Sequence, residues 1–137
     1  LIYPEELEVV AAEGFDTVAI AWDGGASATR AVAAATPLMR KARSVRIFVA
    51  PGEKAQASAT GAEELARHLG RHGVRPMVDA RTSDRPIAAQ LLDYVQERPL
   101  DLLVMGGFGH ARLQEFILGG ATQAMLESPP CPILMTH

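Results

Sequence analysis

The chain has 137 residues, 48% hydrophobic and 21% charged, which is long enough for one domain with a sizeable core and short for two. Its 13 basic and 16 acidic residues are well mixed and give a net charge of -3, which argues against a nucleic-acid backbone as the main partner. No apolar run approaches the roughly 18 residues of a membrane span, and no secretory signal is recognisable, so a soluble cytoplasmic protein without a membrane partner is expected.

Short β-rich runs alternate along the chain with segments of helical periodicity. The sequence predicts strands over residues 17–22, 45–50, 74–78, 100–105 and 133–136. The third of these is expected at a sheet edge, because Pro76 cannot donate a ladder hydrogen bond. Residues 1–14 are acidic and loosely patterned, so we expect them to be an extension or linker before a single domain over residues 15–137, and the chain to be a piece of a longer protein.

Helices are predicted between these strands. The first spans apolar positions 31–42, where Pro37 should kink the helix or loosen its first half. The second covers residues 61–72 and stops at Gly73. The third includes positions 87–95, with Ser83 or Asp84 as its cap, and a fourth begins near Gly120. This alternation predicts an α/β fold, an open doubly wound parallel sheet of five strands with helices on both faces.

A glycine-rich segment follows the fourth predicted strand. Residues 106–109 read Gly-Gly-Phe-Gly, and Gly119 and Gly120 interrupt a later apolar pattern, where each glycine in a helix costs about 1 kcal/mol relative to alanine. Bare backbone after a strand, with a helix N-terminus nearby, is typical of a phosphate site. The alternative is structural: Gly106 and Gly107 form a tight turn, and Gly119 permits close packing of a helix on the sheet.

Asp23 follows the first predicted strand. Ligands of doubly wound sheets bind beyond the carboxyl ends of the strands, where the strand order reverses. Asp23 there could accept hydrogen bonds from ribose hydroxyls or an adenine amine. It is equally compatible with the role of N-cap for the following helix.

Four segments resemble the universal stress protein (UspA-like) family: residues 18–24, 104–109, 118–122 and 130–134, in the same element order over residues 15–137. The resemblance implies the adenine nucleotide alpha hydrolase-like fold with strand order 3-2-1-4-5. It also implies a role in stress response, ATP as cofactor, with or without Mg²⁺, and a homodimer through the final strand or a tandem-domain pairing. The implied nucleotide-binding residues are Ala21, Trp22, Asp23, Val49, Met105, Gly106, Phe108, Gly109, Gly119, Gly120, Ala121 and Thr122.

The chain departs from the family pattern at two positions. The nucleotide signature G-x2-G-x9-G-(S/T) is met by Gly106, Gly109 and Gly119, but Gly120 stands where ATP-binding members have a hydroxyl that contacts phosphate. Thr122 lies two residues on and is a candidate replacement. One such hydrogen bond is worth roughly 0.5–3 kcal/mol, so weakened rather than abolished binding is expected. Trp22 replaces a small or hydroxyl residue, and either stacks on the base or occupies its place.

Other chemistry has less support in the sequence. No P-loop lysine or set of metal-holding carboxylates accompanies the glycines, so no catalytic residue is assigned and at most a slow ATPase is expected. His110 and Arg112 could meet phosphate charge but fit an exposed loop better. His68 and His72 have the spacing of a zinc pair, yet no third ligand is evident, and no metal site is expected. Cys131, among prolines, is expected to be a buried apolar residue.

Three functions therefore remain open. The first is a regulatory domain that binds an adenine nucleotide. The second is a nucleotide-free dimerisation or interaction domain, favoured by Gly120 and Trp22. The third is a weak ATPase or self-phosphorylating enzyme, which only the family resemblance supports.

Overall fold

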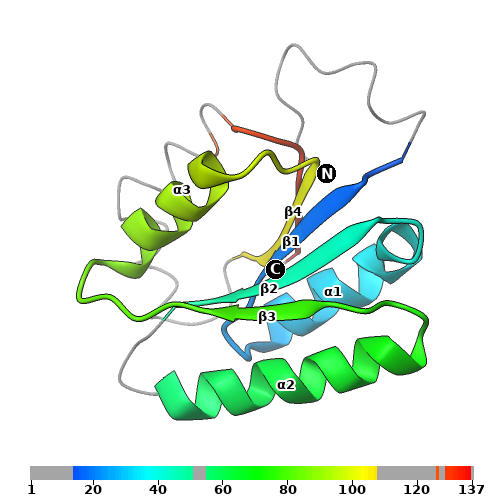
Figure 1. Ribbon diagram of the computed structural model, residues 1–137, viewed down its shortest axis with the longest axis horizontal. Coiled ribbons are helices and arrows are strands. Elements are labelled where there is room, and N and C mark those ends of the chain that lie inside the picture. Colours follow the sequence, from blue (N-terminus) through cyan, green and yellow to red (C-terminus); the bar gives the residue numbers. More distant parts are fainter. Residues whose placement is uncertain (1–13, 51–54, 108–125, 127–128, 137) are drawn as a thin grey trace.

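The computed structural model describes residues 14–50, 55–107, 126 and 129–136. Their elements, in chain order, are β1 (Thr17–Ala21), α1 (Ala26–Met39), β2 (Ser44–Val49), α2 (Ala55–Arg71), β3 (Met77–Ala80), α3 (Ile87–Glu97), β4 (Leu102–Gly106) and β5 (Ile133–Thr136) (Figure 1). All five strands pair in parallel, in the order β3-β2-β1-β4-β5. This confirms the predicted fold class, the sheet order and the edge position of the third strand.

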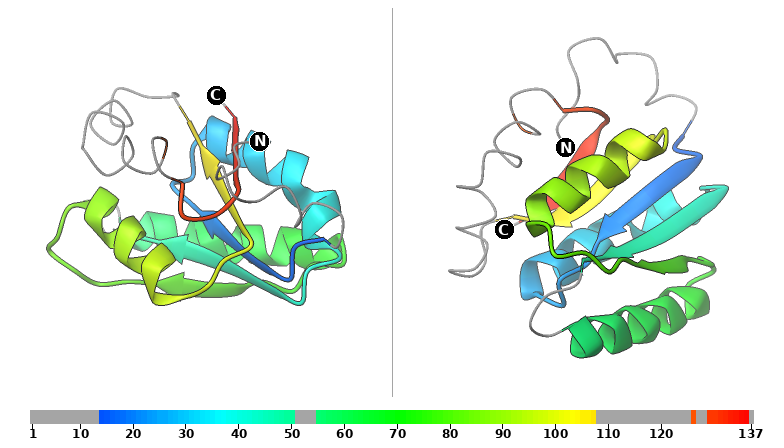
Figure 2. Two further views of the ribbon diagram at one scale, coloured as in Figure 1. Left: turned by 90° about the horizontal axis from the view of Figure 1, so that it is seen from above. Right: turned by 60° about the vertical axis from the view of Figure 1, so that its left-hand side comes forward.

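Helices cover both faces of the sheet. In Figure 2, α1 and α2 lie on one face and α3 on the other. Side chains such as Ile20 and Ile47 form the core beneath α1 and α2, whereas Phe48 and Leu103 belong to the cluster beneath α3. Every residue of β4 is buried, which explains why this strand reads as a continuous apolar run rather than an alternating pattern. No helix in the described ranges is long and apolar enough to cross a membrane.

The third strand begins later than predicted. Val74 was expected to start it, but the Val74 amide donates to the carbonyl of Leu69 at 3.0 Å, closing the C-terminus of α2. Gly73 makes this turn possible with a φ of 82°, a conformation that costs little only for glycine. Val74 is therefore a buried residue of the turn, and β3 starts at Met77.

Three helix predictions need correction. Pro37 lies in the last turn of α1 and does not interrupt it. The second helix begins at Ala55 rather than at residue 61, because Gly61 is accommodated inside it. Neither Ser83 nor Asp84 caps α3: its N-cap is Pro86, which has no side-chain cap bond, and the Ser83 hydroxyl instead accepts from the Arg85 amide. The predicted helix near Gly120 lies outside the described residues.

A network of charged residues joins the C-terminal end of α3 to the β3 edge. The Asp79 carboxylate lies 3.0 Å from Arg98 and 3.8 Å from both Arg46 and Arg81. The guanidinium groups of Arg81 and Arg98 lie 5.1 and 5.2 Å from the ring centroid of the fully buried Tyr94. This network anchors α3 on the sheet beside β2 and β3.

Candidate functional site

The candidate site lies at the carboxyl ends of β1 and β4, which are neighbours in the sheet. Ala21 pairs with Met105 in the register of the two strands, and Phe48, one residue before Val49, pairs with Ala21. From β1 the chain proceeds to β2 on one side, and from β4 to β5 on the other, so the strand order reverses here. This is the position where doubly wound sheets bind ligands.

The sequence-predicted site residues are only partly described. The structure brings together Ala21, Trp22, Asp23, Val49, Met105 and Gly106 at the strand tips. Phe108, Gly109, Gly119, Gly120, Ala121 and Thr122 lie outside the described residues, as do His110 and Arg112.

Gly106 allows α1 to approach the tip of β4. A Cβ atom at this position would lie 2.6 Å from the backbone nitrogen of Ala28 and 3.0 Å from atoms of Ser27. Only glycine therefore permits the first turn of α1 to contact the strand. The sequence offered a tight turn as the structural role of Gly106, but the structure shows close packing of α1 instead. This packing has an electrostatic consequence: the positive end of a 14-residue helix lies against the strand tip.

Gly107 forms a backbone hydrogen bond with the neighbouring strand, β5. Its amide donates to the carbonyl of Thr136 at 2.6 Å, and a Cβ atom here would lie 2.6 Å from the sulfur of Met135. The amide of Gly107 is thus engaged in strand pairing, and its lack of a side chain accommodates Met135, a structural role other than the tight turn that the sequence suggested. An anion at the strand tips would need amides from elsewhere.

A contact between β5 and α1 was not predicted from the sequence. The Thr136 hydroxyl donates to the carbonyl of Ser27 at 2.8 Å, across 109 positions of the chain. Ser27 is 3% exposed. This bond holds the end of the last strand against the helix start at the candidate site. Nothing in the sequence pattern of either residue indicates it, because the bond depends on the tertiary approach that Gly106 permits.

Asp23 is not the N-cap of α1. That position is held by Gly25, which has no side-chain cap bond, and the Asp23 carboxylate accepts from the Gly25 amide at 2.8 Å. The Asp23 side chain is exposed at the end of β1. It stabilises the turn into α1 and presents a carboxylate oxygen to solvent beside the helix start.

Trp22 and Val49 face the core beneath α2. The Trp22 indole packs against this cluster, and its Nε1 atom would lie 3.4 Å from a Cβ placed on Gly61. Nε1 is buried and has no hydrogen-bond partner among the residues that the structure describes. Val49 is 2% exposed and belongs to the same core. Both residues therefore form the wall of the site on the α2 side, with their side chains directed into the protein.

Cys131 is buried at 2% exposure, as the sequence predicted, and burial raises the pKa of its thiol to about 11. At pH 8 only about one thiol in a thousand is then ionised. We expect Cys131, the one cysteine of the chain, to react with a disulfide reagent such as dithionitrobenzoate only after unfolding in urea. Complete reaction within minutes in native buffer would contradict this prediction.

Comparisons with known proteins agree on one family. The model of the universal stress protein family matches residues 14–137. Universal stress proteins of Mycobacterium bovis and of Mycobacterium tuberculosis are 32% identical over 83 residues, which is 59% of this chain. The matched part is 28% of the length of those relatives, so the chain spans well under half of them.

Solved structures share the fold. The universal stress protein UspA of Lactobacillus plantarum is 14% identical, with a TM-score of 0.60 over 90% of this chain and 99% of its own. A universal stress protein of Archaeoglobus fulgidus in complex with dAMP is 13% identical, with a TM-score of 0.65 over 88% and 97%. Another, in complex with cAMP, is 21% identical, with a TM-score of 0.62 over 90% and 98%. By the family match over residues 14–137, the chain belongs to the universal stress protein family.

Proposed function

We propose that this domain binds an adenine nucleotide, preferably ATP with Mg²⁺, across the tips of β1 and β4 as a regulatory ligand in stress response. The observation that carries the proposal is the contact of the first turn of α1 with Gly106, which brings the positive end of the helix next to the strand-order reversal. Asp23 supplies a carboxylate for ribose or adenine on the same edge. The related structures with cAMP and dAMP support the adenine class.

The phosphates are assigned to the signature glycines, Gly109 and Gly119, and to the amide of Gly120. Thr122 is the candidate hydroxyl in place of the missing serine or threonine. Because Gly107 already donates its amide to Thr136, the loop has one donor fewer than its glycine count suggests. Because Gly120 also lacks the hydroxyl of the complete signature, we expect ATP to bind in the micromolar range or more weakly, about tenfold less tightly than with that hydroxyl.

Calorimetric titration with ATP and Mg²⁺ tests the proposal. Gly109→Asp places bulk and negative charge where the phosphates should bind, and should abolish the heat of binding. Gly70→Asp is the matched control, because Gly70 is exposed on α2 and a Cβ there meets nothing within 4 Å. Binding by the native chain and by Gly70→Asp, but not by Gly109→Asp, supports the proposal. Equal binding by both variants contradicts it.

A nucleotide-free interaction domain is the second candidate. It is favoured by the engaged Gly107 amide and by the inward-facing side chains of Trp22 and Val49, which leave few groups for a base. Under this candidate no nucleotide produces heat, and sedimentation shows a dimer in dilute solution without ligand. Phosphate release that disappears in Gly109→Asp would instead indicate the slow ATPase.

Assembly and location are part of the same proposal. We assign residues 1–14 to a linker and residues 15–137 to the binding domain, placed in the cytoplasm. The edge strand β5 is the proposed contact of a homodimer or of a tandem pair of domains. Sedimentation of the chain with and without ATP would separate a ligand-dependent dimer from a permanent one.

A further inference from the structure

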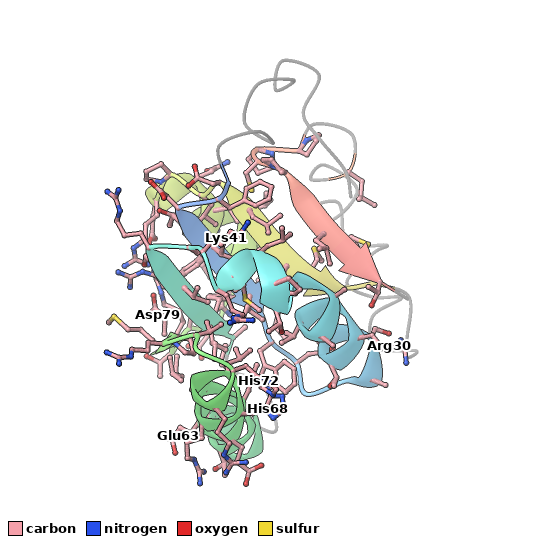
Figure 3. The ribbon with its side chains drawn as sticks, turned by 90° about the vertical axis from the view of Figure 1, so that its right-hand side faces the viewer. Arg30, Lys41, Glu63, His68, His72 and Asp79 are labelled. Atoms are coloured by element: carbon pink, nitrogen blue, oxygen red, sulfur yellow. The ribbon has the colours of Figure 1, made fainter. Side chains whose placement is uncertain are left out.

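We infer that His68 and His72, for which the sequence predicted no metal site, form a binding site for a divalent transition-metal ion at the exposed C-terminal end of α2. The two imidazole rings lie with their centroids 4.7 Å apart and their planes inclined by 54°. Both residues are exposed. Figure 3 shows the two side chains next to each other at the end of α2.

The C-terminal end of α2 supplies this arrangement. Residues four apart on a helix project from the same face, about 5–6 Å between Cβ atoms, so two histidines at this spacing can direct one nitrogen each toward a common point. His68 lies in the last turn of α2, and His72 directly follows its last residue, Arg71, in the turn before Gly73. The His72 amide donates to the Leu69 carbonyl at 2.9 Å, so a hydrogen-bonded turn holds the two rings side by side before any ion arrives.

The ligand type selects the ion. Imidazole nitrogen suits zinc, copper and nickel, whereas magnesium and calcium prefer oxygen ligands. The residues described include no group of three or more histidine, cysteine, aspartate and glutamate side chains able to hold a metal. The pair therefore lacks the third protein ligand of a catalytic or structural zinc centre. We assign it instead to an exchangeable ion that keeps water in its other positions.

The charged side chains of α2 near the pair balance in sign, and Arg40, whose Nε would lie 3.9 Å from a Cβ on Gly73, adds one positive charge from the C-cap of α1. Glu63 and Glu64 precede the pair, while Arg67 and Arg71 flank it, so the two signs balance along this part of α2. The Arg67 guanidinium donates to the backbone carbonyl of Glu63 at 3.4 Å. That bond directs its charge toward the preceding turn of the helix rather than across the two rings.

Calorimetric titration with zinc chloride and with nickel chloride, in buffer without chelators or nucleotide, tests the site. The variant His68→Gln with Arg71→His keeps the number of histidines but places them at adjacent positions, which do not face each other. Because chelation makes the second ligand intramolecular, we expect the affinity of this variant to fall by about 100-fold. The metal-induced rise in Tm should disappear with it.

A second variant shows where the ion binds. The other two histidines, His110 and His137, are changed to asparagine, and this variant should bind metal as the native chain does. Absence of binding by the native chain overturns the inference. So does equal binding by the adjacent-histidine variant, or loss of binding in the His110 and His137 variant. None of these results depends on whether the strand tips bind a nucleotide.

Discussion

Replacing Gly106 with alanine is expected to destabilise the fold by roughly 1–3 kcal/mol or more. The added Cβ would lie 2.6 Å from the backbone nitrogen of Ala28, where real Cβ atoms are essentially never found. Because the obstacle is backbone rather than the end of a flexible side chain, α1 must move away from β4. The Thr136 bond to Ser27 would be strained by the same movement.

Urea denaturation measures this effect, and two other glycines provide the controls. Gly70→Ala adds a Cβ that meets nothing within 4 Å, inside a helix where alanine is preferred, so it should stabilise by up to about 1 kcal/mol. Gly107→Ala meets the Met135 side chain, which can move, and should cost less than Gly106→Ala. If Gly106→Ala and Gly70→Ala have equal unfolding free energies, the contact of α1 with β4 is not close-packed in solution.

The same variant connects packing with ligand binding. Gly106 is the point at which the first turn of α1 reaches the strand tip, so displacing the helix also withdraws its positive end from the proposed phosphate region. A lower ATP affinity is expected in whatever fraction of Gly106→Ala stays folded. Gly70→Ala should leave the affinity unchanged, because α2 contributes no proposed ligand contact at that position.

The sheet was predictable from sequence because its strands are short, β-rich and separated by helical patterns. Buried runs such as β4 and the proline before β3 carried enough information to predict five strands and the position of one edge. The order of the strands came from the family resemblance, since periodicity alone does not determine which strands are neighbours. The start of β3 was wrong because Val74 has a strong β propensity but completes the C-terminal turn of α2.

The site was predictable only in outline. The strand order implied by the family resemblance puts Asp23 and Gly106 at the ends of neighbouring strands, and the pairing of β1 with β4 confirms this. The roles of individual groups were not predictable, because they depend on distances between segments remote in sequence. The amide of Gly107 pairs with β5, and the Asp23 carboxylate bonds to Gly25 instead of capping α1. A glycine count or an acidic residue before a helix carries no information on which donors remain free.

Tyr94→Phe is expected to protect the protein from alkaline unfolding. Burial, and then the negative charge of Asp79, raise the pKa of Tyr94 to about 12 against the opposing effects of Arg98 and Arg46. An unfolded tyrosine has a pKa near 10, so the folded state binds the phenolic proton more tightly. The resulting stability is complete below pH 10 and is lost as the pH rises from 10 through 12. The loss amounts to about 2–3 kcal/mol, at roughly 1.4 kcal/mol for each pH unit.

The substitution isolates this titration because phenylalanine keeps the ring. Tyr94 packs on Phe48 with centroids 4.7 Å apart, a contact that phenylalanine keeps. The buried hydroxyl faces the Asp79 carboxylate, whose hydrogen bond to it contributes to the raised pKa, so removing the hydroxyl should cost about 1 kcal/mol at pH 8. Urea denaturation between pH 8 and 12 should show the native chain losing stability faster than Tyr94→Phe above pH 10. Cys131→Ala measures separately the contribution of the buried thiol, whose raised pKa makes stability fall as the pH rises from about 9 to 11. Parallel curves for Tyr94→Phe and the native chain would mean that the phenol ionises without leaving its buried position.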